Sequence, residues 1–286
     1  MHASRTRAWL ALHFTVLLFG CAGLFGHALA ISPWALVFGR TVFAALSLAA
    51  CLLMLRRPLR AQAGEAGGLA IAAGACLALH WVTFFHAIQV GGVAAGLLGF
   101  AAFPAAVTLL ESLWLRRAPS RRELAMVALV SIGLLLVTPL TGEGAAVRQG
   151  VLWGVASAGL FAVLALLNRG SAQGDPLRLA GWQNAAAAVW LAPMAWPALP
   201  ALTAADWLGL ALLGVVFTAL AHALFLFSLR SLPAQRVAVV TALEPVYGML
   251  FAWLLFGQWP EPRMWLGGAV IVLATVWASL ARDPQH

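Results

Sequence analysis

The most constraining feature of this sequence is the apolar stretch that runs from Val239 to Trp259. It has the length of a helix that crosses a bilayer, which takes about 20 apolar residues. It nevertheless contains Glu244 and Pro245 near its middle. A carboxylate at membrane depth costs about 3 kcal/mol and normally faces a cavity or a partner. Because proline removes a backbone donor at the same level, the stretch predicts a broken membrane helix beside a functional carboxylate.

The same pattern occurs earlier in the chain, in residues 100–121. Pro104 and Pro119 recur 141 residues later as Pro245 and Pro260, with no gap between them. The sequence therefore indicates two copies of one membrane unit.

The amino-acid composition indicates that the chain is embedded in a lipid bilayer. Of its residues, 63% are hydrophobic and 9% are charged, whereas about a quarter of the residues of a soluble domain are charged. The net charge of +8 comes from arginines that lie in short gaps between apolar segments. Such arginines set membrane topology and form no stripe for nucleic acid, so nucleic acid is excluded as a partner.

An all-α membrane protein with ten transmembrane helices is expected. If the N-terminus is cytoplasmic, fourteen arginines lie on the cytoplasmic side and only Arg148 and Arg263 on the other, with Arg40 inside a span. This bias predicts a bacterial-type inner membrane protein with both termini in the cytoplasm. The expected spans are approximately 8–29, 33–55, 68–89, 92–115, 123–140, 150–170, 176–198, 205–229, 234–257 and 262–281.

The repeat divides the chain into two five-helix units, 1–142 and 143–286. The spacing of Pro33 and Arg40 recurs in Pro176 and Gln183. Because five is an odd number, the second unit inserts upside down relative to the first. Inverted repeats of this kind are typical of secondary transporters, whose substrate site lies near the midplane between the halves.

These residues resemble a known family. The Glu244-Pro245 pair, the Pro33…Arg40 pattern and two units of five helices are similar to the drug/metabolite transporter superfamily, and in particular to its ten-span EamA-type exporters. The resemblance implies the fold and an export function. Within the superfamily, the chain is most similar to exporters of amino acids, aromatic ones included.

The third span carries a candidate binding stripe. His80, Thr83 and Phe84 share one helix face, while Trp81 and His86 point elsewhere. An imidazole, a hydroxyl and an aromatic ring suit a pocket for a small zwitterion with a flat side chain. The alternative is that His80 is hydrogen-bonded between helices for packing only.

The fourth and ninth spans occupy equivalent positions in the two halves. Phe100 and Phe103 correspond to Thr241 and Glu244, so an aromatic wall would face a polar patch. Glu244 could bind an ammonium group or exchange a proton. Alternatively, it is a structural partner of the backbone or of a histidine near the helix break.

Arg40 is the one arginine that lies well inside an expected span, away from its ends. It could bind a substrate carboxylate through its planar fork, or pair with Glu244 or Glu111 and lock the halves together. Its repeat counterpart Gln183 keeps hydrogen bonding without the charge. Arg40, Gln183 and Glu111 are therefore assigned to gating or charge pairing.

The eighth span repeats the pairing of a histidine with a ring, in His222 and Phe225, so these two join the candidate binding residues. Pro104 and Pro245 would let the helices that line the cavity bend. Runs such as Gly150-xxx-Gly154 predict close helix contacts.

The expected function is alternating-access export of amino acids and related small metabolites by a secondary transporter. The sequence holds no nucleotide-binding loop, no enzyme signature and no metal-ligand spacing. Neither enzyme activity nor a cofactor or metal is therefore expected, and the energy must come from a gradient, with protons as a possible partner. The oligomeric state stays open, and a monomer is compatible with the sequence. The rivals are an exporter of cationic drugs, a membrane enzyme that uses the histidines, and a structural subunit.

Overall fold

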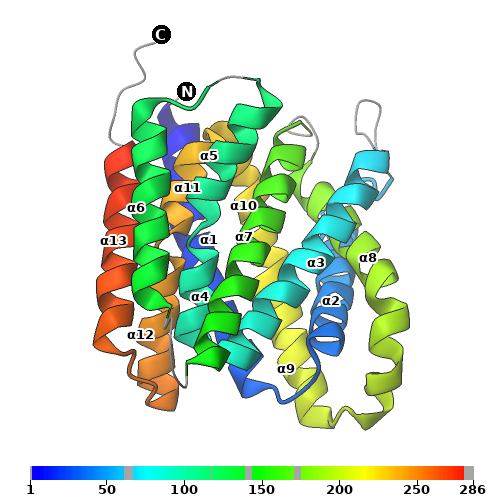
Figure 1. Cartoon of the computed structure of the whole chain (residues 1–286). Helices are drawn as coiled ribbons and strands as arrows, with labels where there is room; N and C mark the ends of the chain where they lie inside the picture. The colour runs from blue at the N-terminus through cyan, green and yellow to red at the C-terminus, as the bar shows by residue number, and fades with distance from the viewer. Residues whose placement is uncertain (1, 61–66, 117, 139–143, 171–174, 280–286) are drawn as a thin grey trace.

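A computed structural model describes residues 2–60, 67–116, 118–138, 144–170 and 175–279 (Figure 1). This described part is helical and contains no strand. Its elements are α1 (His2–Ala28), α2 (Pro33–Met54), α3 (Gly67–Gly91), α4 (Val93–Phe100), α5 (Phe103–Trp114), α6 (Arg121–Val137), α7 (Ala145–Gly170), α8 (Pro176–Ala195), the 3₁₀ helix η1 (Trp196–Ala201), α9 (Ala204–Gly214), the π-helix η2 (Val215–Leu220), α10 (Ala221–Ser231), α11 (Ala234–Thr241), α12 (Glu244–Phe256) and α13 (Pro262–Ser279).

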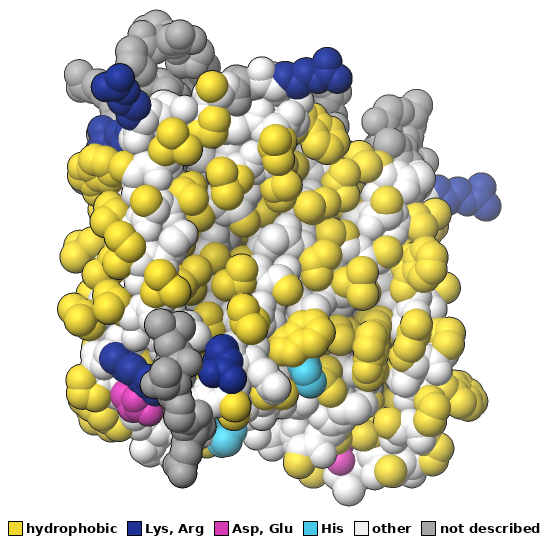
Figure 2. Space-filling model, in the orientation of Figure 1, with side chains coloured by type: hydrophobic (Ala, Val, Ile, Leu, Met, Phe, Trp, Pro, Cys, Tyr) yellow, Lys and Arg dark blue, Asp and Glu magenta, His cyan; other side chains and the backbone are white. Residues whose placement is uncertain are grey.

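Seven helical segments of the described part are long and apolar enough to cross a membrane. Figure 2 shows apolar side chains over the middle of one face and arginines near its two ends, as a lipid-embedded bundle requires. The other three expected spans, near α6, α8 and α13, do not reach this length and hydropathy. Residues 139–140 and 280–281 of those spans lie outside the described part. The count of ten spans therefore stays a prediction.

Two of the membrane segments are broken at equivalent places. The first break, at residues 101–102, separates α4 from α5, and the second, at residues 242–243, separates α11 from α12. Pro104 and Pro245 lie in the first turn of the helix that follows each break. Proline is tolerated there because its missing N–H would have no partner inside the helix. Each break therefore comes just before its proline.

The two halves of the chain interlock. Helix α3 packs along α7, α2 packs along α8 and α9, and α1 lies against α10 and α12. Helices α4 and α5 also contact α7, while α6 and α13 pack on each other. The interior is consequently lined by side chains from both halves.

Glycines allow α7 to approach α4 at backbone distance. A Cβ atom built on Gly154 would lie 2.6 Å from the carbonyl oxygen of Gly96 and 2.9 Å from the backbone nitrogen of Phe100. Gly150 meets Gly91 of α3 in the same way. The expected small-residue contact is therefore present along this face of α7, and it fixes the height of Phe100 in the bundle.

Replacing Gly154 with alanine should destabilise the protein by about 1–3 kcal/mol, because the added methyl would meet rigid backbone atoms. Gly159 of the same helix is a matched control, since a Cβ there has no atom within 4 Å. Gly159→Ala should be neutral or stabilising by about 0.5–1 kcal/mol, because alanine favours the helix. Thermal unfolding of both variants in detergent tests this, and equal midpoints would contradict the close contact.

Candidate functional site

A small cavity lies in the interior, among α1, α2, α3, α4, α7, α10 and α12. It has room for only about one or two water molecules. Both halves of the chain contribute to it. The residues that line it are Phe19, Ala22, Arg40, Leu77, His80, Trp81, Phe84, Phe100, Phe161, His222 and Glu244.

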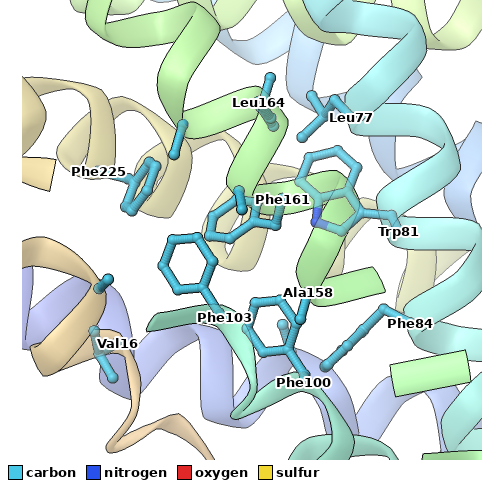
Figure 3. Close-up of a cluster of buried hydrophobic side chains, with 14 of the residues drawn as sticks. Val16, Leu77, Trp81, Phe84, Phe100, Phe103, Ala158, Phe161, Leu164 and Phe225 are labelled. Atoms are coloured by element: carbon cyan, nitrogen blue, oxygen red, sulfur yellow. The ribbon is translucent and has the colours of Figure 1, made fainter. Parts of the chain in front are cut away.

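Aromatic rings form much of the wall, as Figure 3 shows for α3, α4 and α7. Phe161 of α7 joins them, with its ring centroid 5.6 Å from that of Phe100 and 4.8 Å from that of Phe103. Phe225 lies 5.2 Å from Phe161. Phe84 and Phe100 line the cavity, whereas Phe103 and Phe225 back the rings that do. Phe161 was not singled out from the sequence.

Arg40 is buried, with 1% of its surface exposed. Its Nε donates a hydrogen bond to Thr218 Oγ1 at 2.8 Å, and its Cζ lies 3.9 Å from the ring centroid of Trp81. A guanidinium over an indole face is attracted by the negative face of the ring. The side chain is thus held in one orientation at the cavity wall.

The expectation that Trp81 points away from the binding face was wrong. Trp81 lines the cavity, and its ring meets that of His222 edge to face at 6.0 Å. Helix α3 is packed against α1, α2, α7 and α8, so more than one stripe of it faces protein. Neighbouring residues, 100° apart, can then both point inward. His86 does point elsewhere, and its ring contacts Trp153 at 5.0 Å.

Thr218, the hydrogen-bond partner of Arg40, lies in the π-helix η2 (Val215–Leu220). Within it, Thr218 Oγ1 donates to the carbonyl oxygen of Leu213 at 2.8 Å and accepts from Arg40. Single π turns often occur at functional sites. The sequence offers one hint, Gly214, where a Cβ would lie 2.7 Å from the carbonyl oxygen of Arg40. That glycine lets the eighth span approach α2.

Glu244 supplies the carboxylate of the cavity. It is the first residue of α12 and is 3% exposed. Its Oε2 has no hydrogen-bond partner within the described residues. Arg40 lines the same cavity, yet no ion pair joins the two side chains in the described part of the chain. The direct pair with Glu244, one interpretation of Arg40, is therefore absent from the described residues, and both side chains face the same cavity.

The two histidines of the cavity differ in their surroundings. His80 Nδ1 lies 2.8 Å from Ser157 Oγ, and its ring stacks on Phe161 at 4.5 Å. His222 Nδ1 lies 3.1 Å from Asn184 Nδ2. Because an amide nitrogen donates, Nδ1 accepts and Nε2 carries the proton, and this Nε2 has no partner within the described residues. His222 therefore offers a free donor.

Four further residues expected at the site do not line the cavity. Thr83 donates back to carbonyl oxygens of its own helix, and Thr241 does the same. Gln183 donates to Asn168 Oδ1. Glu111 is buried in α5. A hydroxyl at membrane depth can bond the carbonyl three or four residues back, so its presence on an inward face does not by itself make it a binding group.

Comparison with known proteins identifies the class. A model of the EamA-like transporter family matches the chain twice, at residues 7–138 and 148–280. The chain therefore belongs to the EamA-like transporter family, within the drug/metabolite transporter superfamily. It is a multi-pass membrane transporter, in agreement with its apolar helices.

Individual relatives agree with this assignment. The chain is 23% identical to the uncharacterized transporter YxxF of Bacillus subtilis strain 168 over 283 residues, which cover 97% of this chain and 91% of the relative. It is 26% identical to the uncharacterized transporter YwfM of the same organism over 224 residues, or 76% and 75% of the two chains. A crystal structure with 18% identity superposes with a TM-score of 0.73 over 96% of this chain and 97% of the other, so the two share a fold.

Proposed function

We propose that this transporter exports amino acids, including aromatic ones, across the inner membrane by alternating access. One observation carries the proposal. The cavity brings together a guanidinium, from Arg40, and a carboxylate, from Glu244, that do not pair with each other, between aromatic walls. A zwitterion with a flat side chain complements all three features.

The match between a zwitterionic amino acid and the cavity gives each part of the cavity a role. Arg40 would bind the substrate carboxylate, since its planar fork can present two parallel donors. Glu244 would accept from the ammonium group, and the rings of Phe84, Phe100 and Phe161 would hold the side chain. Because the present cavity has room for only about one or two water molecules, an amino acid can enter only if the helices around it move. That requirement favours alternating access.

The helix contacts support a design of ten spans in two inverted halves. Counting α4 with α5, α9 with η2 and α10, and α11 with α12 as single spans gives ten. The contact of α1 with α10 then has its counterpart in α7 with α3, and that of α1 with α12 in α7 with α5. The self-equivalent pairs α2 with α8 and α6 with α13 are also in contact. A pseudo-twofold axis in the membrane plane would produce this exchange.

The orientation follows from charge. In Figure 1, α1 begins and α13 ends at the same end of the bundle. The connections from α2 to α3, from α5 to α6 and from α10 to α11 are at that end, and in the sequence they hold or adjoin Arg57, Arg121 and Arg230. Helices α7 and α13 begin at the other end, and Arg148 and Arg263 lie near their starts. By the positive-inside rule, the arginine-rich end would be cytoplasmic.

Flux measured in proteoliposomes tests the proposal. Purified protein would be given labelled phenylalanine, a panel of other amino acids and one cationic dye, each with and without an imposed proton gradient. We expect saturable amino-acid flux that depends on protein. Flux of the dye alone would overturn the amino-acid assignment.

A second candidate, export of cationic drugs, has its own support. Arg40 is already engaged by Thr218 and Trp81, whereas Glu244 Oε2 has no partner within the described residues. On this reading Glu244 alone binds the substrate and Arg40 is structural. Dye flux that needs Glu244 but tolerates changes at Arg40 would favour this candidate.

A further inference from the structure

A second group of buried polar side chains adjoins the cavity through His222, and the function proposed above assigns none of them a role. It consists of Asn168 on α7, Gln183 and Asn184 on α8, and His222 on α10. Their exposed fractions are 3%, 0%, 0% and 2%. We call them the amide cluster. None carries a formal charge when the imidazole is neutral, which sets the cluster apart from Arg40 and Glu244.

The hydrogen bonds of the amide cluster are half complete. Gln183 Nε2 donates to Asn168 Oδ1, and Asn184 Nδ2 bonds both the carbonyl oxygen of Ala180 and His222 Nδ1. Four atoms have no partner within the described residues: Asn168 Nδ2, Gln183 Oε1, Asn184 Oδ1 and His222 Nε2. Each of the four side chains therefore has one satisfied and one free polar atom.

These free atoms are too costly to leave unpaired. A buried donor or acceptor without a partner costs about 1–3 kcal/mol, and buried polar groups are nearly always satisfied. Exchanging the oxygen and nitrogen of Asn168 and Gln183 together would reverse their bond and still leave one free atom on each. The cluster is thus built to bond something else, namely water or a polar solute.

Position links the amide cluster to the transport route. His222 belongs to both the cluster and the cavity. Asn168 lies two residues from the end of α7, whereas Phe161 in the cavity lies seven residues deeper, or about 10 Å along the helix. In Figure 1, α7 ends and α8 begins at the arginine-rich end of the bundle. The cluster therefore lies between the cavity and that end.

The free atoms also have the composition that a zwitterion needs. Asn168 Nδ2 and His222 Nε2 are donors, which suit a carboxylate, while Gln183 Oε1 and Asn184 Oδ1 are acceptors, which suit an ammonium group. Gln183 is, moreover, the repeat counterpart of Arg40. An uncharged site would hold the same solute less tightly than the charged cavity does, as a site on a passage requires.

We propose that the amide cluster is a second, uncharged amino-acid site, hydrated when empty, through which the solute passes between the cavity and the arginine-rich end of the bundle. The site deepens the proposed function and rests on it for the identity of the solute.

Cysteine labelling tests the site without measuring transport. Cys21, Cys51 and Cys76 are first replaced with alanine, and Gln183→Cys is compared with Ala187→Cys in proteoliposomes. Ala187 is the matched control because it lies one turn further along α8, is 0% exposed and packs in the apolar core. A membrane-impermeant thiosulfonate should react with Gln183→Cys at least about tenfold faster, since a thiolate forms only where water reaches the thiol. L-Phenylalanine should slow that reaction.

Equal labelling rates at the two positions would overturn the proposal, and so would fast labelling that phenylalanine leaves unchanged. Because labelling and its protection need no flux, these failures are distinguishable from a failure of amino-acid transport.

Apolar isosteres provide a second test. The double variant Asn168→Leu/Gln183→Met removes both partners of one hydrogen bond, a change that is nearly neutral or stabilising when the pair serves packing alone. We expect unchanged or higher thermal stability together with phenylalanine flux at least about tenfold lower, as a lost charge-assisted contact would give. Unchanged flux in a stable double variant would overturn the proposal. If the double variant does not fold, the labelling rates decide.

Discussion

Glu244→Gln is expected to lower amino-acid flux by about 10- to 100-fold while the protein still inserts and elutes as the parent does. A hydrogen bond to a charged group contributes about 1.5–3 kcal/mol, and each 1.4 kcal/mol corresponds to about tenfold in binding. Glu244 Oε2 has no partner within the described residues, so its bonding capacity is available to a ligand. Glutamine keeps the shape but cannot offer a negative charge to an ammonium group.

The matched control for this change is Glu261→Gln. Glu261 is exposed and pairs with Arg263 at 2.7 Å, outside the cavity. Exposed pairs contribute about 0–1 kcal/mol, so flux should stay at the parent level. Initial rates over a range of substrate concentrations, in proteoliposomes with equal protein content, provide the comparison. Parent-level flux in Glu244→Gln would remove the carboxylate from the binding site.

The sequence was sufficient for features that depend on local physics. Span length follows from bilayer thickness, and a helix break follows from a proline that cannot complete the helix. The breaks before Pro104 and Pro245 can therefore be predicted from the local sequence alone. The burial of Arg40 and Glu244 belongs to the same class, because an ionisable side chain at membrane depth must face protein.

The parts of the cavity that were missed depend on contacts between distant segments. Phe161 lies in a run of small and apolar residues with no polar neighbour to mark it, and it joins the cavity only because α7 packs on α3 and α4. Thr218, which accepts a hydrogen bond from Arg40, lies in a π-helix of the eighth span, and helical periodicity does not predict a π-helix. Trp81 was assigned to the wrong face because a single stripe was assumed for a helix that has protein on several sides.

Thr83 and Thr241 were expected among the binding residues, and that role stays a prediction. In the sequence, both residues are close to residues that line the cavity. Helical periodicity cannot distinguish a hydroxyl that faces a cavity from one that bonds its own helix. Their bonds to the preceding turn could be recognised only from coordinates. The unpartnered polar atoms of the amide cluster also depend on how the helices pack. Nothing in the sequence around Asn168 and Asn184 predicts which of their atoms lack a partner.

Arg40→Gln is expected to abolish amino-acid flux and to leave any flux of a cationic dye intact. The change copies the repeat counterpart Gln183 into the first half and removes the one guanidinium of the cavity. Arg40→Lys should not rescue amino-acid flux, which we expect to stay at least about tenfold below the parent. A lysine lacks the planar fork that both donates to Thr218 and lies over the ring of Trp81.

A double-mutant cycle then separates the role of Arg40 and Glu244 in substrate binding from their joint contribution to the free energy of unfolding. Removing one partner of a buried pair costs about 3–5 kcal/mol because the other charge stays uncompensated. Arg40 and Glu244 line one cavity without touching, and opposite charges held there would attract each other. Each single change should therefore lower the unfolding free energy by somewhat less than that. The double variant Arg40→Gln/Glu244→Gln should then be more stable than the sum of the single changes predicts, by at least about 1 kcal/mol.

Thermal or denaturant unfolding of the four proteins in detergent measures this coupling. Strict additivity would mean that the two charges act independently and that the cavity does not hold them as a pair. A coupling in stability together with a loss of amino-acid flux in both single variants would have one physical explanation. The two side chains would neutralise each other across the empty cavity, and a zwitterion would replace that long-range attraction with a direct contact at each of its ends.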